Sequence, residues 1–135
     1  MTDAMIDAFG LEVLDRDECI TLLGTAEIGR VVFTTRGLPA VEPVKYQVRG
    51  DSVWFAVEAR TELFGSAHDG VVAFEVDAFD ATLRTGWWVT VLGRATVAPE
   101  CDLPRPPKLS WQPPLAGDVR CVRIPIEVVS GRRVA

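Results

Sequence analysis

The chain begins with a helix-like spacing of apolar residues and then turns to strand-like patterns. Every third or fourth residue of the first part is apolar, at Cys19, Leu22, Leu23 and Ala26. Asp15 precedes this stripe and Glu18 follows three residues later, which is the spacing of a capping box. The pattern predicts one short amphipathic helix at the start of the domain.

Three β-rich runs follow, at residues 28–35, 40–48 and 53–59, and the turn sequences RGLP and RGDS separate them. Such runs joined by short glycine-containing loops predict an antiparallel meander. In the third run the period of two places alternate residues on opposite faces. One face carries Val53, Phe55 and Val57, and the other carries Trp54, Ala56 and Glu58.

Beyond the meander, residues 61–68 can form two helical turns before the sequence returns to strands. VVAFEVDAFD reads as one strand, and GWWVTVLGRATVA reads as a long strand in which Gly93 marks a bulge or bend. The proline-rich stretch 98–117 predicts an irregular connection, and VRCVRIPIEVVSGRR predicts the last strand. We therefore expect a mainly β fold of about six antiparallel strands, closed or partly closed into a small barrel, with an N-terminal and an inserted helix.

The length and the net charge of the chain limit the classes of protein to which it can belong. The 135 residues suit a single domain, 1–135, in which we expect residues 1–12 to be a flexible N-terminal segment. A net charge of −5 argues against nucleic acid and anionic membranes as partners. The N-terminus has no basic start and no apolar run is long enough to span a bilayer, so the sequence predicts a cytoplasmic protein.

The residues that most often perform chemistry are few. Three widely spaced cysteines, Cys19, Cys101 and Cys121, argue against a disulfide framework or a zinc knuckle, and we expect free thiols. The only histidine, His68, is expected on the surface at a helix end. Glu75 and Asp77 share one strand face without a nearby ligand of another type, which indicates solvated carboxylates rather than a metal site. No catalytic acid, base or nucleophile is assigned.

Two adjacent tryptophans, Trp87 and Trp88, must point to opposite faces of their strand. One ring then faces the interior of the barrel and the other faces outward. The outward ring needs a cover, which either a second subunit or a flat ligand would provide.

Several segments in a fixed order carry a resemblance to a known family. They are GRVVF, LPAVEPVKY, VVAFEVD, GWWVTVLGRA and VRIPIEVVSGRR, together with a tryptophan- and proline-containing loop, and they span residues 12–134. In this order the chain resembles pyridoxamine 5′-phosphate oxidase-related proteins of the actinobacterial type. The resemblance implies a flavin-binding split barrel of Greek-key type. It also implies a homodimer that holds FMN, or sometimes the deazaflavin F420, in two grooves between its subunits.

The same resemblance implies a set of cofactor-binding residues. The backbone of the second strand, Val41, Glu42, Pro43, Val44, Lys45 and Tyr46, would line the flavin, and Arg60, Thr61 and Glu62 would hold its phosphate. Trp87 and Trp88 match the strand that approaches the ring system. Trp111 lies in the loop that would reach the partner's site.

The chain departs from this family pattern at three positions. Lys45 replaces an asparagine, Glu62 replaces a lysine that contacts phosphate, and Trp88 replaces a small residue. A glutamate repels a phosphate, although Arg60, Thr61 and the free N–H groups of a helix start could compensate. The segment is therefore a rebuilt anion site, a lost one, or an ordinary capped helix start.

Three functions remain open on these grounds. The first is an FMN-dependent oxidoreductase of unknown substrate, in which the cofactor supplies the redox chemistry. The second is a non-catalytic split-barrel dimer that has lost flavin and binds other molecules. The third is an F420-binding relative, ranked below FMN because a long polyanionic tail needs more exposed lysine or arginine than the site offers.

Overall fold

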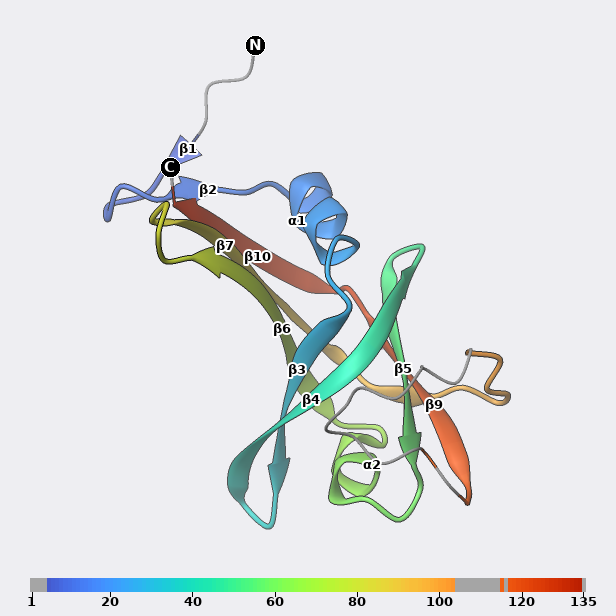
Figure 1. Ribbon diagram of the computed structural model, residues 1–135. Helices are drawn as coiled ribbons and strands as arrows, with labels where there is room; N and C mark the ends of the chain where they lie inside the picture. The colour runs from blue at the N-terminus through green and yellow to red at the C-terminus, as the bar shows by residue number, and fades with distance from the viewer. Residues whose placement is uncertain (1–4, 104–114, 116, 135) are drawn as a thin grey trace.

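A computed structural model describes residues 5–103, 115 and 117–134, which form one curled antiparallel sheet and two helices (Figure 1). The elements within this part of the chain are, in order, β1 (Met5–Ile6), β2 (Glu12–Val13), α1 (Arg16–Leu23), β3 (Ile28–Thr35), β4 (Leu38–Arg49), β5 (Ser52–Glu58), α2 (Glu62–Ala67), β6 (Val71–Asp80), β7 (Thr85–Arg94), β8 (Thr96–Val97), β9 (Val119–Pro125) and β10 (Val128–Val134).

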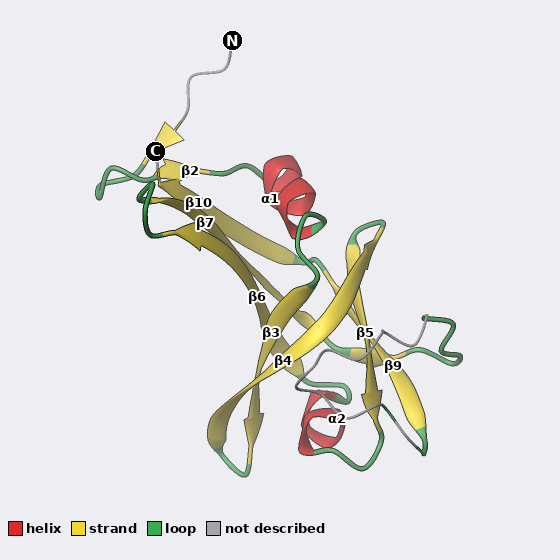
Figure 2. Ribbon diagram, in the orientation of Figure 1, coloured by secondary structure: helices red, strands yellow, loops and turns green. Residues whose placement is uncertain are grey.

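The strands are ordered β1-β2-β10-β7-β6-β3-β4-β5-β9-β8 across the sheet. The predicted meander is confirmed, because β4 pairs with β3 on one side and with β5 on the other. Figure 2 shows that the sheet curls around its interior, with α1 at one end and α2 at the other. The mainly β barrel with two helices is therefore confirmed, although the described part contains ten strands rather than about six.

The first helix begins at the predicted cap, and the second begins one residue inside its predicted range, after a cap that was not predicted. The Asp15 carboxylate accepts a hydrogen bond from the backbone N–H of Glu18 at 2.8 Å, which satisfies a free donor of the first turn of α1. Thr61 plays the same role for α2 by accepting from the N–H of Phe64 at 3.2 Å. Cys19 and Leu23 of α1 are buried, and so is Leu63 of α2, so each helix packs its apolar side against the sheet.

The last predicted strand is in fact two strands, and this prediction was wrong. β9 pairs with β5 and β8, whereas β10 pairs with β7 and β2, so the chain passes from one end of the sheet toward the other at Ile126. Pro125 ends β9 because it has no N–H for a ladder. The predicted bend at Gly93 lies beside this crossing, since a Cβ at Gly93 would come within 2.2 Å of the Pro125 carbonyl oxygen.

The N-terminal segment also differs from the expectation of a flexible 1–12. Within the described part, β1 pairs with β2, and β2 pairs with β10. Asp7 accepts a hydrogen bond from Arg132 at 3.0 Å, and Arg133 lies 3.3 Å from Glu12. Residues 5–13 therefore extend the edge of the sheet next to the C-terminal strand.

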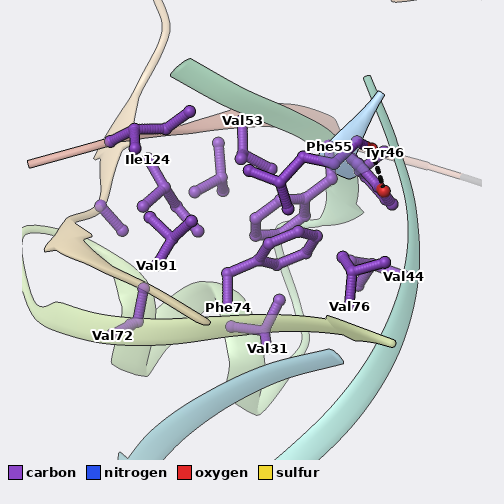
Figure 3. Packing of buried hydrophobic residues seen from close by; sticks show 14 of the residues in the cluster. Val31, Val44, Tyr46, Val53, Phe55, Val72, Phe74, Val76, Val91 and Ile124 are labelled. Carbon is purple, nitrogen blue, oxygen red and sulfur yellow. Dashed lines mark hydrogen bonds between the residues drawn. The ribbon is translucent and has the colours of Figure 1, made fainter. Parts of the chain in front are cut away.

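The core lies on the inner face of the curled sheet (Figure 3). Phe55 and Phe74 are fully buried, and the Tyr46 ring contacts that of Phe74 edge-on at 4.9 Å. The Phe74 ring covers Gly29, where a Cβ would lie 2.2 Å from it. The predicted inward face of β5 is confirmed, since Val53, Phe55 and Val57 are all buried.

The cysteine prediction was right for one thiol and wrong for two. Cys19 is a buried free thiol, whereas Cys101 and Cys121 form a disulfide across 20 residues of sequence. The bond ties the segment after β8 to the outer side of β9. His68 is exposed at the C-terminal end of α2, as predicted. None of the helices in the described residues is long and apolar enough to cross a membrane.

Candidate functional site

The start of α2 was the predicted phosphate-binding segment, and its polar groups already have partners. The Thr61 hydroxyl donates to the Glu58 carbonyl at 2.8 Å while it caps α2. The Arg60 guanidinium donates to the Glu58 carboxylate at 2.6 Å. Glu62 lies 3.5 Å from Arg36, which reaches it from the β3–β4 turn. Two arginines and two glutamates therefore neutralise one another around this helix start.

A small cavity of about 190 Å³ adjoins the segment, lined by Glu58, Arg60, Gly117 and Asp118. Arg120 donates two hydrogen bonds to Asp118 and holds the pKa of that carboxyl below its usual range, so the carboxylate stays charged. Two carboxylates and one paired guanidinium line the cavity. This charge pattern does not attract a phosphate.

The second predicted part of the site, residues 41–46 of β4, presents an open backbone edge. β4 pairs with β3 from Leu38 to Lys45, but with β5 only from Tyr46 to Arg49. Among the described strands, the first two thirds of β4 therefore have a neighbour on one side alone, and the two halves of the barrel separate there. A strand edge with unpaired N–H and C=O groups can hydrogen-bond a polar ligand.

The side chains of this stretch alternate between the two faces. Val44 and Tyr46 are buried in the core, and the Tyr46 hydroxyl donates to the Leu23 carbonyl. Burial raises the pKa of Tyr46 to about 12 and also raises the pKa of Glu42. Val41, Pro43 and Lys45 point to the opposite face, where Val41 is 60% exposed.

The two adjacent tryptophans do occupy opposite faces. Trp87 packs against the core and lines a cavity of about 440 Å³ at the end of the β6–β7 hairpin, together with Ala78 and Arg133. Trp88 lies on the other side, with its ring centroid 6.2 Å from that of Phe79. The remaining predicted residue, Trp111, lies outside the described residues.

One chain does not bring these parts together. The start of β7, with both tryptophans, lies beside the C-terminal end of β10, whereas α2 lies at the other end of the molecule (Figure 1). The predicted phosphate-binding residues and the predicted ring-binding residues are therefore far apart within the monomer.

The sheet carries a further feature, which we call the outer face: the side of β10, β7, β6, β3 and β4 that points away from the core. An apolar row crosses all five strands at matched register positions, Val128, Leu92, Ala73, Val32 and Val41. Val41 and Val128 are 60% and 58% exposed, and Leu92 is 44% exposed. Such a row on a solvent-facing sheet is typical of an interaction surface.

A charged cluster lies next to this row, formed by Arg30 of β3 with Glu75 and Asp77 of β6. Arg30 Nη1 donates to Asp77 at 3.0 Å but is 3.7 Å from Glu75 Oε1, too far for a hydrogen bond. That oxygen is buried without a hydrogen-bond partner. Burial first, and then the neighbouring Asp77, raise the pKa of Glu75 to about 7, while the positive charge of Arg30 opposes the shift.

The prediction of solvated carboxylates at Glu75 and Asp77 was therefore wrong, since both side chains are about three quarters buried. The sequence signal was present but incomplete. Polar residues alternate with apolar ones along β6, and Arg30 stands alone in the apolar β3. The register that places Arg30 opposite Glu75 comes from the fold.

Comparison with known proteins gives solved structures of the same fold. An FAD-binding protein from Mycobacterium smegmatis has a TM-score of 0.73 and 26% identity, over 93% of this chain and 99% of that one. An FAD-binding protein from Mesorhizobium loti has the same TM-score at 22% identity, over 93% of this chain and 99% of its own. The second likeness shows the fold alone.

A curated sequence relative is also found. The chain is 43% identical over 88 residues to the uncharacterized protein Rv0080 of Mycobacterium tuberculosis, over 62% of this chain and 58% of that protein. The match thus spans little more than half of the relative's length. A family model described as pyridoxamine 5′-phosphate oxidase matches residues 15–133. Together with the split-barrel fold, this match shows that the chain belongs to the pyridoxamine 5′-phosphate oxidase family.

Proposed function

We propose that this chain is a flavin-binding split-barrel protein that acts as a homodimer, with FMN as its cofactor and an oxidoreductase reaction on a small molecule. The observation that carries the proposal is the family match over residues 15–133. The likeness to the Mycobacterium smegmatis protein, whose name states that it binds FAD, supports a flavin in general. FMN is the form that the sequence resemblance implies, and FAD is its competitor.

The ring-binding part of the proposed site fits a flat, largely apolar group. Trp88 and Phe79 form an aromatic pair on the outer face, and the open edge of β4 offers backbone donors and acceptors. Because α2 and the start of β7, which carries both tryptophans, lie at opposite ends of one chain, a site that uses both must combine two subunits. A homodimer with sites in the grooves between its chains meets this requirement.

The phosphate-binding part does not fit. Arg60 is held by Glu58, and Glu62 faces Arg36, so the start of α2 offers no spare positive charge. A phosphate placed there would also meet the carboxylates of Glu58 and Asp118. We therefore propose that the flavin is held mainly through its ring system and gains little from its phosphate.

A bound flavin would supply hydride transfer. The protein's own contribution would be to orient the ring between aromatic side chains and to exclude water with the apolar row of the outer face. None of the described residues near this row is assigned as an acid, base or nucleophile. The proposal places the protein in the cytoplasm, where reducing conditions would keep the Cys101–Cys121 pair open to reduction.

Purification and titration test this proposal. The purified protein should be yellow or take up added flavin, and FMN, FAD and riboflavin should be compared by the quenching of flavin fluorescence. Similar affinities for FMN and riboflavin are expected, because both arginines described at the start of α2 are already paired with glutamates. Failure to bind all three flavins contradicts the proposed function. Binding of F420 alone assigns the chain to the deazaflavin relatives instead.

A second function is favoured by one observation, the neutralised charges at the start of α2. A chain that has lost its phosphate-binding residues could persist as a non-catalytic dimer that binds other molecules. Colourless protein that dimerises but binds neither flavins nor F420 supports this alternative.

A further inference from the structure

The outer face combines exposed apolar side chains with a carboxyl oxygen that has no hydrogen-bond partner. The apolar row crosses five strands at Val128, Leu92, Ala73, Val32 and Val41. Next to it, Glu75 Oε1 is buried and lies beyond hydrogen-bond distance of Arg30. Covering this face would bury the Glu75 carboxyl further.

The charges on this face complement those of a second copy. The two acids, Glu75 and Asp77, form a column on β6. Cations stand on both sides of the column: Arg30 on β3, which already donates to Asp77, Lys45 on β4, and Arg132 on β10, which already pairs with Asp7. A twofold rotation about an axis that runs along the strands between β3 and β6 would place the acid column of one copy over Arg30 of the other, and apolar row over apolar row.

We propose that two copies of this chain associate through the outer face, and that the assembled dimer holds Glu75 in its protonated form. The proposal rests on the homodimer of the proposed function and adds the face and the proton. Trp88, which lies on the same side, is covered by the same contact.

The charged groups around Glu75 explain why a proton is required. Arg30 from β3 already donates to Asp77, and on β7 the residue opposite Glu75 is the uncharged Thr90. Asp77, its neighbour on β6, adds a second negative charge. Lys45 and Arg132 stand one strand further away, opposite Ile28 and Trp88. An ionised Glu75 would thus be buried with one cation shared between two carboxylates, which is costly.

The protonation of Glu75 is coupled to dimerisation in a definite direction. The pKa of Glu75 is already about 7 in the single chain, and further burial in the dimer raises it. Assembly then takes up protons, so the dimer weakens as the pH rises above 7. Between pH 6 and 8, loss of the Glu75 proton raises the dissociation constant of the dimer about tenfold for each of the two chains. The dissociation constant is therefore about a hundredfold larger at pH 8 than at pH 6.

Sedimentation of the full chain at pH 6, 7 and 8 measures this dissociation constant. Glu75→Gln keeps the shape of the protonated acid, so its dimer should stay tight and vary less than about threefold over this pH range. Asp17→Asn, which removes an exposed carboxylate on α1, is the matched control and should follow wild type. If Glu75→Gln and wild type share one pH dependence, or if wild type shows none, the role of Glu75 is overturned.

A second pair of variants tests the face without relying on titration. Leu92→Glu places a charge in the middle of the apolar row and should leave folded monomers at every pH. Leu83→Glu, at an equally apolar but more exposed position in the β6–β7 turn, should remain dimeric. A dimer that survives Leu92→Glu uses another surface and overturns the inference while the homodimer stands.

If the wild-type chain is monomeric from pH 6 to 8, two copies do not associate, and a different protein would be the partner of the outer face. That result overturns both the inference and the proposed homodimer. Flavin binding is decided separately by the titration above.

Discussion

The outer side of β5 and β9 and the outer face of β10, β7, β6, β3 and β4 belong to one curled sheet. Within the part of the chain that the structure describes, only the first of these two regions is covered by another segment. Cys121 on β9 stands opposite Ala56, is 1% exposed and is bonded to Cys101. Arg49 pairs with Asp102 of the same covering segment at 2.9 Å. On the outer face, by contrast, Val41 and Leu92 are exposed.

This difference shows how one strand pattern leads to two outcomes. Both regions alternate between a buried inner face and a second face of mixed character. Where the connection after β8 folds back, a covalent bond and an ion pair fix the cover within the chain. Where no described segment folds back, the apolar row stays exposed, and it is there that we propose a second copy to bind.

The largest expected effect comes from removing the covalent cover. Reduction of the Cys101–Cys121 bond, or Cys101→Ser with Cys121→Ser, should lower the free energy of unfolding by about 3 kcal/mol, because a loop of 20 residues regains its freedom in the unfolded chain. Urea unfolding with and without a phosphine reductant measures this change.

The double variant also serves as the control for that experiment. Its stability should not respond to the reductant, whereas wild type should fall to the level of the variant. Equal stability of oxidised and reduced wild type would show that the bond does not stabilise this cover, and the contrast between the two outer sides would then rest on packing alone.

Much of the fold follows from the sequence because it depends on local patterns. The cap at Asp15 and the alternation in β5 each act over a few residues. The division of the last run into β9 and β10 did not follow, because both halves are equally strand-like. What separates them is where each finds a partner strand. Pro125 marks the break but is also common at the end of a single strand.

The candidate site was less predictable because its features join distant segments. The alternation of Trp87 and Trp88 follows from strand geometry, but only the register shows that Trp87 faces the core. Arg36 reaches Glu62 from a turn where its own φ is 53°, which the sequence does not specify. The pairing of Cys101 with Cys121 likewise depends on how the connection folds.

Replacing Trp88 with a small residue should show that the two outer sides of the sheet differ in flavin binding. Because Trp88 lies on the outer face rather than in the core and belongs to the aromatic pair proposed to hold the flavin ring, Trp88→Ser should fold and should weaken flavin binding by about tenfold. Trp54→Ser is the matched control, since Trp54 lies on the outer side of β5 near Arg49. Fluorescence titration with FMN measures both variants. Equal losses in the two variants would contradict a specific role for Trp88.

A smaller effect than the two above is expected for Glu75→Gln, which should change how the free energy of unfolding depends on pH. The pKa of Glu75 is raised from 4.5 to about 7, so the stabilisation by the protonated form is complete below pH 4.5 and is lost as the pH rises through 7. Glu75→Gln should then be more stable than wild type at pH 8 by about 1 kcal/mol, a value kept low because the side chain is 30% exposed.

Urea unfolding at pH 5 and 8 provides the measurement, at protein concentrations low enough to keep both proteins monomeric. Asp17→Asn should show the wild-type dependence. A wild-type stability that rises from pH 5 to 8 relative to Glu75→Gln would reverse the sign and show that Arg30 stabilises an ionised Glu75.

The smallest effect is expected from a variant at the start of α2, where the charges neutralise one another. This segment is not part of the outer face. Glu62→Lys removes a carboxylate, adds an ammonium group and releases Arg36 from its 3.5 Å ion pair. FMN affinity should rise by about two- to fivefold, a modest gain because Glu62 is 62% exposed and the new charge is screened by solvent.

Asp17→Lys makes the same change in net charge on α1 and should leave FMN affinity unchanged. Riboflavin, which has no phosphate, should bind all three proteins equally, and the gain for FMN should shrink at high salt. If Glu62→Lys strengthened FMN and riboflavin alike, the segment would act on the ring or the fold rather than on the phosphate. If Asp17→Lys strengthened FMN as much as Glu62→Lys, the negative charge of the whole protein would account for weak FMN binding, and the pairing of Arg36 with Glu62 would play no part.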